Sequence, residues 1–167
     1  KSEILTPDEI LRLTRLFIAG GVNQVRLTGG EPLLRPDLLP LVEALGQLPL
    51  KKLAMTTNAT LLPRFANDLF ERGLRSFNVS LDSLIPERFA QAVRRDALEQ
   101  VLNGLQQLHD LQDVSGQRCE IKINNVIIKD FNEDEVLDFA ALARDRGWSI
   151  RFIEFMPLGK DDHWSHR

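Results

Sequence analysis

Apolar residues recur along this chain at two alternating spacings, one typical of helices and one typical of strands. In the first segment Ile10, Leu13 and Phe17 lie at helical spacing, and the pair Gly20-Gly21 ends the segment. Residues 24–28 then alternate between polar and apolar positions, as a half-buried strand does. These patterns continue and predict further helices after Asp37, over 63–72, over 88–93, after Asp96 and after Asn132, and further strands over 51–56, 76–81, 120–128 and 149–153.

This order of elements predicts a parallel sheet, because strands that alternate with helices are joined by crossover connections. Two architectures have such an order: an open doubly wound sheet and part of a βα-barrel. Five strands suit the open sheet. The chain, however, begins with a helix and has 167 residues, whereas a full barrel needs about 250. The pattern therefore predicts one α/β domain over residues 1–167 and leaves both architectures open.

Composition and charge narrow the range of partners. Hydrophobic residues make up 43% of the chain and charged residues 27%, which is typical of a folded globule. Because 21 Lys and Arg face 24 Asp and Glu, the net charge is −3, and neither nucleic acid nor a membrane is expected as a partner. The single cysteine, Cys119, fits a reducing cytoplasm and cannot by itself hold a metal site.

Polar residues occupy one face of most of the predicted strands. In the first strand Val25 and Leu27 share a face, and Arg26 lies on the other. The polar positions of these strands would then meet in one interior, and they are Arg26, Asn78, Ser80, Asp82, Lys122, Asn124 and Arg151. Such an interior must hold water, internal ion pairs such as Lys122 with Glu120 or Asp82, or a polar ligand. Three cations favour an anionic ligand such as a polyphosphate.

Turn-forming and small polar residues follow the strands at the ends where parallel α/β folds bind ligands. The first such segment, Thr28-Gly29-Gly30-Glu31-Pro32, resembles the glycine-rich motif of radical S-adenosylmethionine (SAM) enzymes. Five segments, taken in their order along the chain, resemble the GTP 3′,8-cyclase family, and the resemblance extends over about residues 5–158. These segments are 25–35, Thr56-Thr57-Asn58, Asn78-Val79-Ser80-Leu81-Asp82-Ser83, Lys122-Ile123-Asn124 and 151–156.

The resemblance implies an incomplete TIM-type βα-barrel, with parallel strands and outer helices. It implies an enzyme of molybdenum cofactor biosynthesis that converts GTP to a cyclic pyranopterin precursor, using SAM and a [4Fe–4S] cluster. Gly30, Ser80 and Met156 would line the SAM site. The residues that would bind GTP are Arg26, Thr56, Lys122, Arg151 and Arg35. The resemblance assigns no catalytic side chain and no metal ligand within this chain.

The chain also departs from the family pattern. It lacks the Cys-x3-Cys-x2-Cys motif for the SAM cluster and the cysteines of a second cluster, and Ala59 stands where the family usually has glycine. We therefore expect an inactive central fragment of a GTP 3′,8-cyclase, whose parent enzyme could be a homodimer. Two alternatives remain: a cluster-free nucleotide-binding or scaffold barrel, and another radical SAM enzyme.

Overall fold

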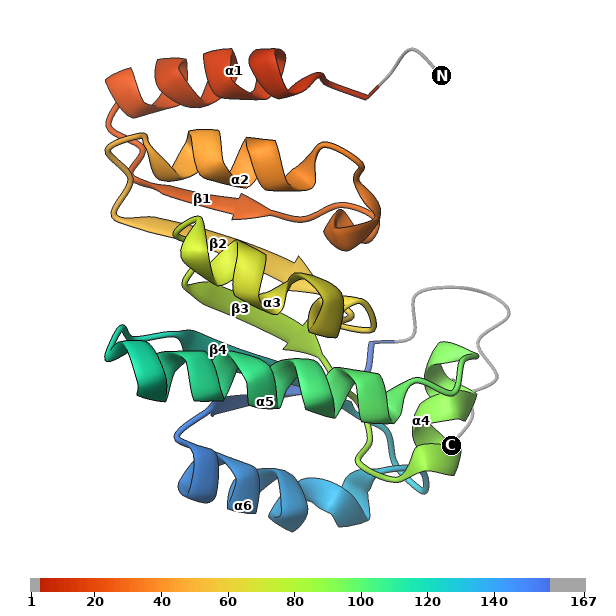
Figure 1. Cartoon of the computed structure of the whole chain (residues 1–167). Coiled ribbons are helices and arrows are strands. Elements are labelled where there is room, and N and C mark those ends of the chain that lie inside the picture. The colour runs from red at the N-terminus through yellow and green to blue at the C-terminus, as the bar shows by residue number, and fades with distance from the viewer. Residues whose placement is uncertain (1–3, 157–167) are drawn as a thin grey trace.

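The computed structural model describes residues 4–156 (Figure 1). Their strands are β1 (Gln24–Leu27), β2 (Lys52–Thr57), β3 (Ser76–Ser80), β4 (Glu120–Ile127) and β5 (Ser149–Glu154). The α-helices are α1 (Pro7–Ala19), α2 (Leu38–Gly46), α3 (Leu62–Glu71), α4 (Pro86–Val93), α5 (Leu98–Ser115) and α6 (Val136–Arg146). Two short 3₁₀ helices are η1 (Pro32–Leu34) and η2 (Glu133–Glu135). No helix of this part of the chain is long and apolar enough to cross a membrane.

The order of the strands distinguishes between the two architectures. The sheet runs β1-β2-β3-β4-β5, and every neighbouring pair is parallel. A doubly wound sheet reverses its strand order at a switch point, whereas right-handed crossovers that always advance in one direction place their helices on one face. Helices α2, α3, α5 and α6 lie along one face of the sheet, and α4 lies beyond the strand ends (Figure 1). The prediction of a partial βα-barrel is confirmed.

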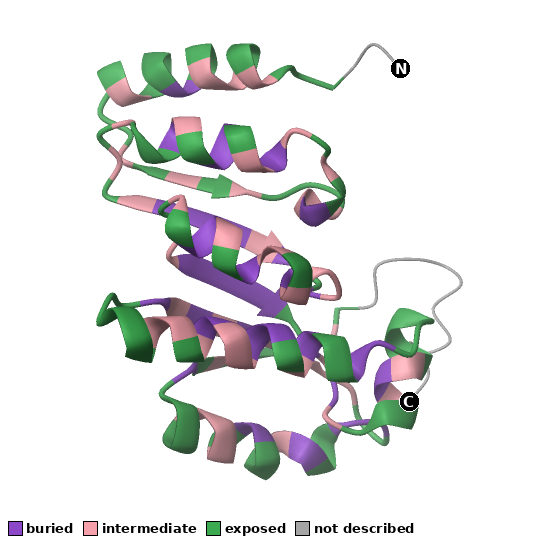
Figure 2. Cartoon of the chain, in the orientation of Figure 1, coloured by how far each residue is buried: buried purple, intermediate pink, exposed green. Residues whose placement is uncertain are grey.

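The core lies between these helices and the sheet face that they cover. Along β3 and β4, Phe77, Val79, Ile121 and Ile123 point to this face and are at most 4% exposed. Figure 2 shows the same contrast on the helices, whose buried positions face the sheet while their outer positions are exposed. The buried helical residues include Leu41, Val42, Leu45, Leu62, Leu69, Leu105 and Leu108. The other face of the sheet, which none of the described helices covers, is called the inner face below.

Helix starts differ in detail from the sequence predictions. Thr6 caps α1 as expected, with its side chain accepting from the Glu9 N–H and the Glu9 carboxylate accepting from the Thr6 N–H. The predicted cap at Asp96 is wrong, because α5 has Ala97 at its N-cap and no side chain bonds there. The segment after Asn132 first forms η2, and the Asn132 side chain has another function that is described below.

Candidate functional site

The register of the sheet aligns the polar residues of the inner face in rows. One row joins Arg26 to Glu120 through Ala54 and Ser76. The next row joins Thr56, Asn78 and Lys122, and a third joins Ser80, Asn124 and Arg151. Neighbouring strands lie roughly 4.8 Å apart, so Thr56 and Lys122 are separated by roughly 10 Å across Asn78. The predicted GTP residues Arg26, Thr56, Lys122 and Arg151 therefore share one face.

Lys122 has a partner on this face. Its Nζ lies 2.5 Å from Glu120 Oε1, and Lys52 Nζ pairs with Glu120 Oε2. The Ser76 hydroxyl donates to the same oxygen over 2.8 Å. Partial burial alone would raise the pKa of Glu120, but the hydrogen bonds from Lys122, Lys52 and Ser76 lower it to about 2. Two lysines thus share one carboxylate, which leaves this group with a net positive charge.

Other polar groups of the inner face have no internal partner. Arg26 and Arg151 are exposed, and neither forms an ion pair within residues 4–156. Asn78 is only 2% exposed, yet its Oδ1 accepts no hydrogen bond from any described residue. A buried acceptor without a donor is costly. Internal ion pairs therefore account for Lys122 but not for the whole polar face, which leaves charge and hydrogen-bonding capacity for a ligand.

The carboxylate of Glu31 holds the glycine-rich turn against the end of β2. Its Oε1 accepts from the Thr57 hydroxyl over 2.7 Å and from the Leu33 N–H, and its Oε2 accepts from the Asn58 N–H over 2.8 Å. Within the turn, Gly29 has φ 134°, which favours glycine. A Cβ added to Gly30 would meet nothing within 4 Å. Packing does not require glycine at this second position, so a ligand could approach its backbone.

Ala59 continues this anchored segment. Its N–H donates to the Thr57 hydroxyl oxygen over 2.9 Å, and its methyl group is fully buried. The residue has φ 58°, in the left-handed region that favours glycine. This explains structurally why a glycine is expected at the position, and the chain places an alanine there with local backbone strain.

A second set of contacts orders the ends of β3 and β4. The buried Glu135 accepts from the Ser83 hydroxyl, from the Leu84 N–H and from Arg88. Asn132 donates through Nδ2 to the Asp82 and Val126 carbonyls. The sequence pattern predicts only a helix start after Asn132. The sequence gives no signal for most of these contacts, because the partners Asp82, Ser83, Leu84 and Arg88 lie about 50 positions away.

These loops border a cavity of about 350 Å³ at the carboxyl ends of β3, β4 and β5. Its wall combines apolar side chains such as Val126 and Ile153 with Asp82, Glu154 and Met156. Burial raises the pKa of Asp82, and a hydrogen bond from the Val126 N–H opposes that effect. The predicted SAM residues Met156 and Ser80 lie at this end of the strands, as does the turn of Gly30. Such a mixed cavity suits an organic ligand with a polar portion.

Arg35 lies apart from the inner-face rows in its contacts. It follows η1, donates to the Leu5 carbonyl over 2.8 Å and pairs with Asp37. The first contact ties the segment after η1 to the start of α1, and the second stays within the segment that leads into α2. The Arg35 guanidinium therefore has partners outside the inner face. The assignment of Arg35 to GTP stays a prediction.

The described residues do not fit an iron–sulfur cluster. Cys119 is 7% exposed on the helix-covered side of the sheet, and burial raises its pKa to about 12. Cluster ligation needs several accessible thiolates. Within residues 4–156 there is also no group of three or more His, Cys, Asp or Glu that could hold a metal ion. This part of the chain therefore supplies no site for such a cluster.

Comparison with known proteins confirms the resemblance seen in the sequence. The Radical SAM superfamily matches residues 1–143. A GTP 3′,8-cyclase of Acaryochloris marina is 50% identical over 98% of this chain and 50% of that protein. GTP 3′,8-cyclase 1 of Pseudomonas aeruginosa is 46% identical over 96% of this chain and 47% of that protein. The chain thus spans about half the length of these relatives.

A more distant relative and a solved structure extend this picture. Molybdenum cofactor biosynthesis protein moc-5 of Caenorhabditis elegans is 42% identical over 97% of this chain and 26% of that protein. The crystal structure of SuiB from Streptococcus suis aligns with a TM-score of 0.76 at 17% identity, over 96% of this chain and 36% of SuiB. At that identity the likeness concerns the fold alone, and it supports the partial barrel.

Proposed function

Because the chain belongs to the radical SAM superfamily, we propose that it forms the nucleotide-binding part of a GTP 3′,8-cyclase. This lyase converts GTP to the cyclic pyranopterin precursor of the molybdenum cofactor. One observation carries the proposal: Arg26, Lys122 and Arg151 lie on the same face of the sheet on three of its strands, and two of the three have no ion-pair partner in the described part of the chain. The similarity to proteins named GTP 3′,8-cyclase supports it.

In this proposal the inner face binds GTP. The three cations bind phosphate oxygens from different directions, because they project from separate strands in adjacent rows. Thr56 offers a hydroxyl in the same row as Lys122, on the other side of Asn78. Lys122 can bind a phosphate without leaving Glu120 uncompensated, since Lys52 also neutralises that carboxylate. Arg35 contributes to phosphate binding after it exchanges its present contacts.

SAM occupies the carboxyl ends of the strands in the same proposal. The backbone of Gly30 meets the amino end of SAM, where the structure leaves space above the turn. Ser80 and Met156 line the site from β3 and from the end of β5, and Met156 borders the cavity there. The cluster that supplies an electron for SAM cleavage belongs to the rest of the parent enzyme, because one buried thiol cannot ligate it.

Two further properties of the parent enzyme belong to the proposal. We expect it to work in the cytoplasm, where a free thiol such as Cys119 stays reduced, and a homodimer is compatible with its family. The described part of the chain is expected to bind, orient and shield its two organic ligands without cleaving SAM itself.

The decisive experiment is a calorimetric titration of GTP into the Lys122→Ala variant beside a thermal melt. We expect a loss in affinity of about 10- to 100-fold, because a charge-assisted hydrogen bond to phosphate contributes roughly 1.5–3 kcal/mol. The melting temperature should change little, since Lys52 still pairs with Glu120. The matched control is Lys129→Ala, at an exposed lysine two residues beyond β4.

The two readouts separate the phosphate assignment from a purely structural one. Unchanged GTP affinity together with a lower melting temperature would show that Lys122 only neutralises Glu120. Equal loss of affinity in Lys122→Ala and Lys129→Ala would mean that general charge, rather than the inner face, attracts GTP.

A further inference from the structure

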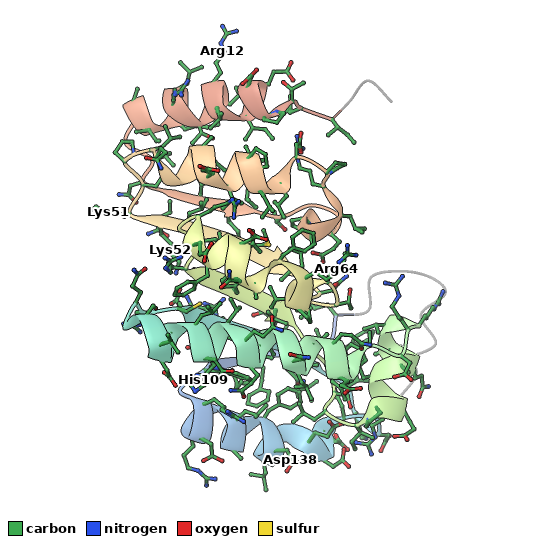
Figure 3. All side chains as sticks on the ribbon, viewed as in Figure 1. Arg12, Lys51, Lys52, Arg64, His109 and Asp138 are labelled. Carbon is green, nitrogen blue, oxygen red and sulfur yellow. The ribbon has the colours of Figure 1, made fainter. Side chains whose placement is uncertain are left out.

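A second cavity lies at the opposite, amino-terminal end of the strands. Its volume is about 400 Å³, and connections that lead into β2, β3 and β4 line it. Its cationic residues come from three separate connections and are Lys51, Lys52, Arg75 and Arg118. The labelled side chains in Figure 3 show Lys51 and Lys52 at the start of β2, whereas Arg64 lies toward the other end of the sheet. Neither the predicted GTP residues nor the predicted SAM residues line this cavity.

Positive charge in this cavity exceeds negative charge. Glu120 is the only carboxylate among the described residues that line it, and both its oxygens are already bound to lysines. Lys51 and Arg118 are exposed and form no ion pair within the described part of the chain. Four cations thus face one shared carboxylate in a protein whose overall charge is −3. The excess is local and is not a consequence of a basic composition.

Arg75 gives this cavity a fixed cationic group. Its Nη2 donates to Gln117 Oε1 over 2.6 Å, and its Nη1 donates to the Phe70 carbonyl. The guanidinium carbon lies 3.8 Å from the centre of the Phe70 ring. None of these partners is a carboxylate, so the guanidinium is positioned without being neutralised. Burial also lowers the pKa of Arg75, as expected for a desolvated cation without a carboxylate partner.

We propose that the cavity bordered by Lys51, Lys52, Arg75 and Arg118 binds a phosphate group. Two arginines and two lysines suit a compact anion with several charged oxygens, because guanidinium groups bind two oxygens at once and ammonium groups bind from any direction. The Ser76 hydroxyl adds a polar group to the same wall. The phosphate could belong to a free anion or to a nucleotide on the inner face. The assignment to a nucleotide rests on the proposed function.

The test is a calorimetric titration of inorganic pyrophosphate into a double variant, Lys51→Gln with Arg118→Gln. These two residues are chosen because they have no internal partner to lose, unlike Arg75 and Lys52. We expect affinity to fall by about 10-fold or more, since at least one charge-assisted hydrogen bond is lost. Thermal melts should show both proteins folded.

The matched control is Arg12→Gln with Arg64→Gln, which removes the same charge from two exposed positions away from the cavity. It should bind pyrophosphate as the unaltered protein does. Equal affinity in the two double variants would overturn the proposal, and so would no binding of pyrophosphate to the unaltered protein at millimolar concentrations. A loss seen only in Lys122→Ala would also overturn it, because the anion would then lie on the inner face.

Titration of GTP into the same variants identifies the source of the phosphate. If the cavity variant loses affinity for pyrophosphate alone, the cavity takes a free anion. If it loses affinity for GTP as well, the cavity takes the nucleotide's phosphates. Failure of the proposed function has a different signature: Lys122→Ala would bind GTP normally, whatever the cavity variant does.

Discussion

The same strands form both faces of the sheet, but one face carries apolar side chains that pack under the helices and the other carries polar side chains. Phe77 and Asn78 are neighbours on β3, and they are 0% and 2% exposed. Phe77 packs under the helices among apolar side chains, so its environment is complete. Asn78 lies on the inner face with an acceptor that no described residue satisfies. Burial alone therefore does not distinguish a residue of the apolar core from a polar residue whose buried acceptor has no partner among the described residues.

The largest effect that would sharpen this contrast is expected from Phe77→Ala. Removal of a fully buried aromatic ring should lower the free energy of unfolding by about 3–5 kcal/mol, because apolar burial is lost and a cavity remains. The adjacent Asn78→Ala should change it by less than about 1 kcal/mol, since no hydrogen bond within the described chain is lost. Urea unfolding measures both. Similar losses in the two variants would contradict the contrast between the faces.

A smaller effect is expected when alanine replaces glycine at two matched positions. A Cβ at Gly104 of α5 would lie 2.7 Å from the Leu62 Cβ of α3, so Gly104→Ala should destabilise the protein by about 1–3 kcal/mol. A Cβ at Gly30 would meet nothing, so Gly30→Ala should leave stability within about 0.5 kcal/mol. Instead it should weaken SAM binding, because the methyl group occupies the space above the turn.

Thermal melts and SAM titrations of both glycine variants test this pair of expectations. A destabilised Gly30→Ala variant would show that the turn needs glycine for folding rather than for a ligand. A Gly104→Ala variant of normal stability would mean that α3 and α5 can move apart at little cost.

The smallest effect concerns acid stability on the inner face. Glu120 has its pKa lowered to about 2, from an ordinary value of 4.5. Its ion pairs therefore contribute stability that is fully present above pH 4.5 and is lost as the pH falls toward 2. The contribution should be only about 1 kcal/mol, because the side chain is partly exposed and water screens the charges.

Urea unfolding of the protein and of Glu120→Gln across this pH range measures that contribution. The variant should be less stable near neutral pH, and the difference should shrink as the pH falls from 4.5 toward 2. A difference that stays constant over this range would mean that Glu120 contributes through packing rather than through its charge.

The local sequence pattern predicted which strand face carries the site residues, but it did not predict the contacts between segments that are far apart in the sequence. Strand alternation placed Arg26, Lys122 and Arg151 on one face because side chains of a strand alternate with a period of two residues, whatever its neighbours are. It could not identify Lys52 as the second partner of Glu120, because that contact depends on the register between strands that are far apart in the sequence. Strand alternation could not predict the anchoring contacts of Glu31 and Glu135 for the same reason.

The sequence by itself determined the order of helices and strands, the polar character of one strand face and the family resemblance of the glycine-rich turn. The periodicity alone left two architectures open, and the tertiary structure decided that the strands lie in sequential order with their helices on one side, as the family resemblance implied. The tertiary structure alone showed that Glu120 is shared by two lysines and that cations from three connections meet at the amino-terminal cavity. The physical reason is the separation in sequence over which each effect acts. Periodicity and turn chemistry act between residues a few positions apart, whereas strand order and charge clusters arise when distant segments pack together.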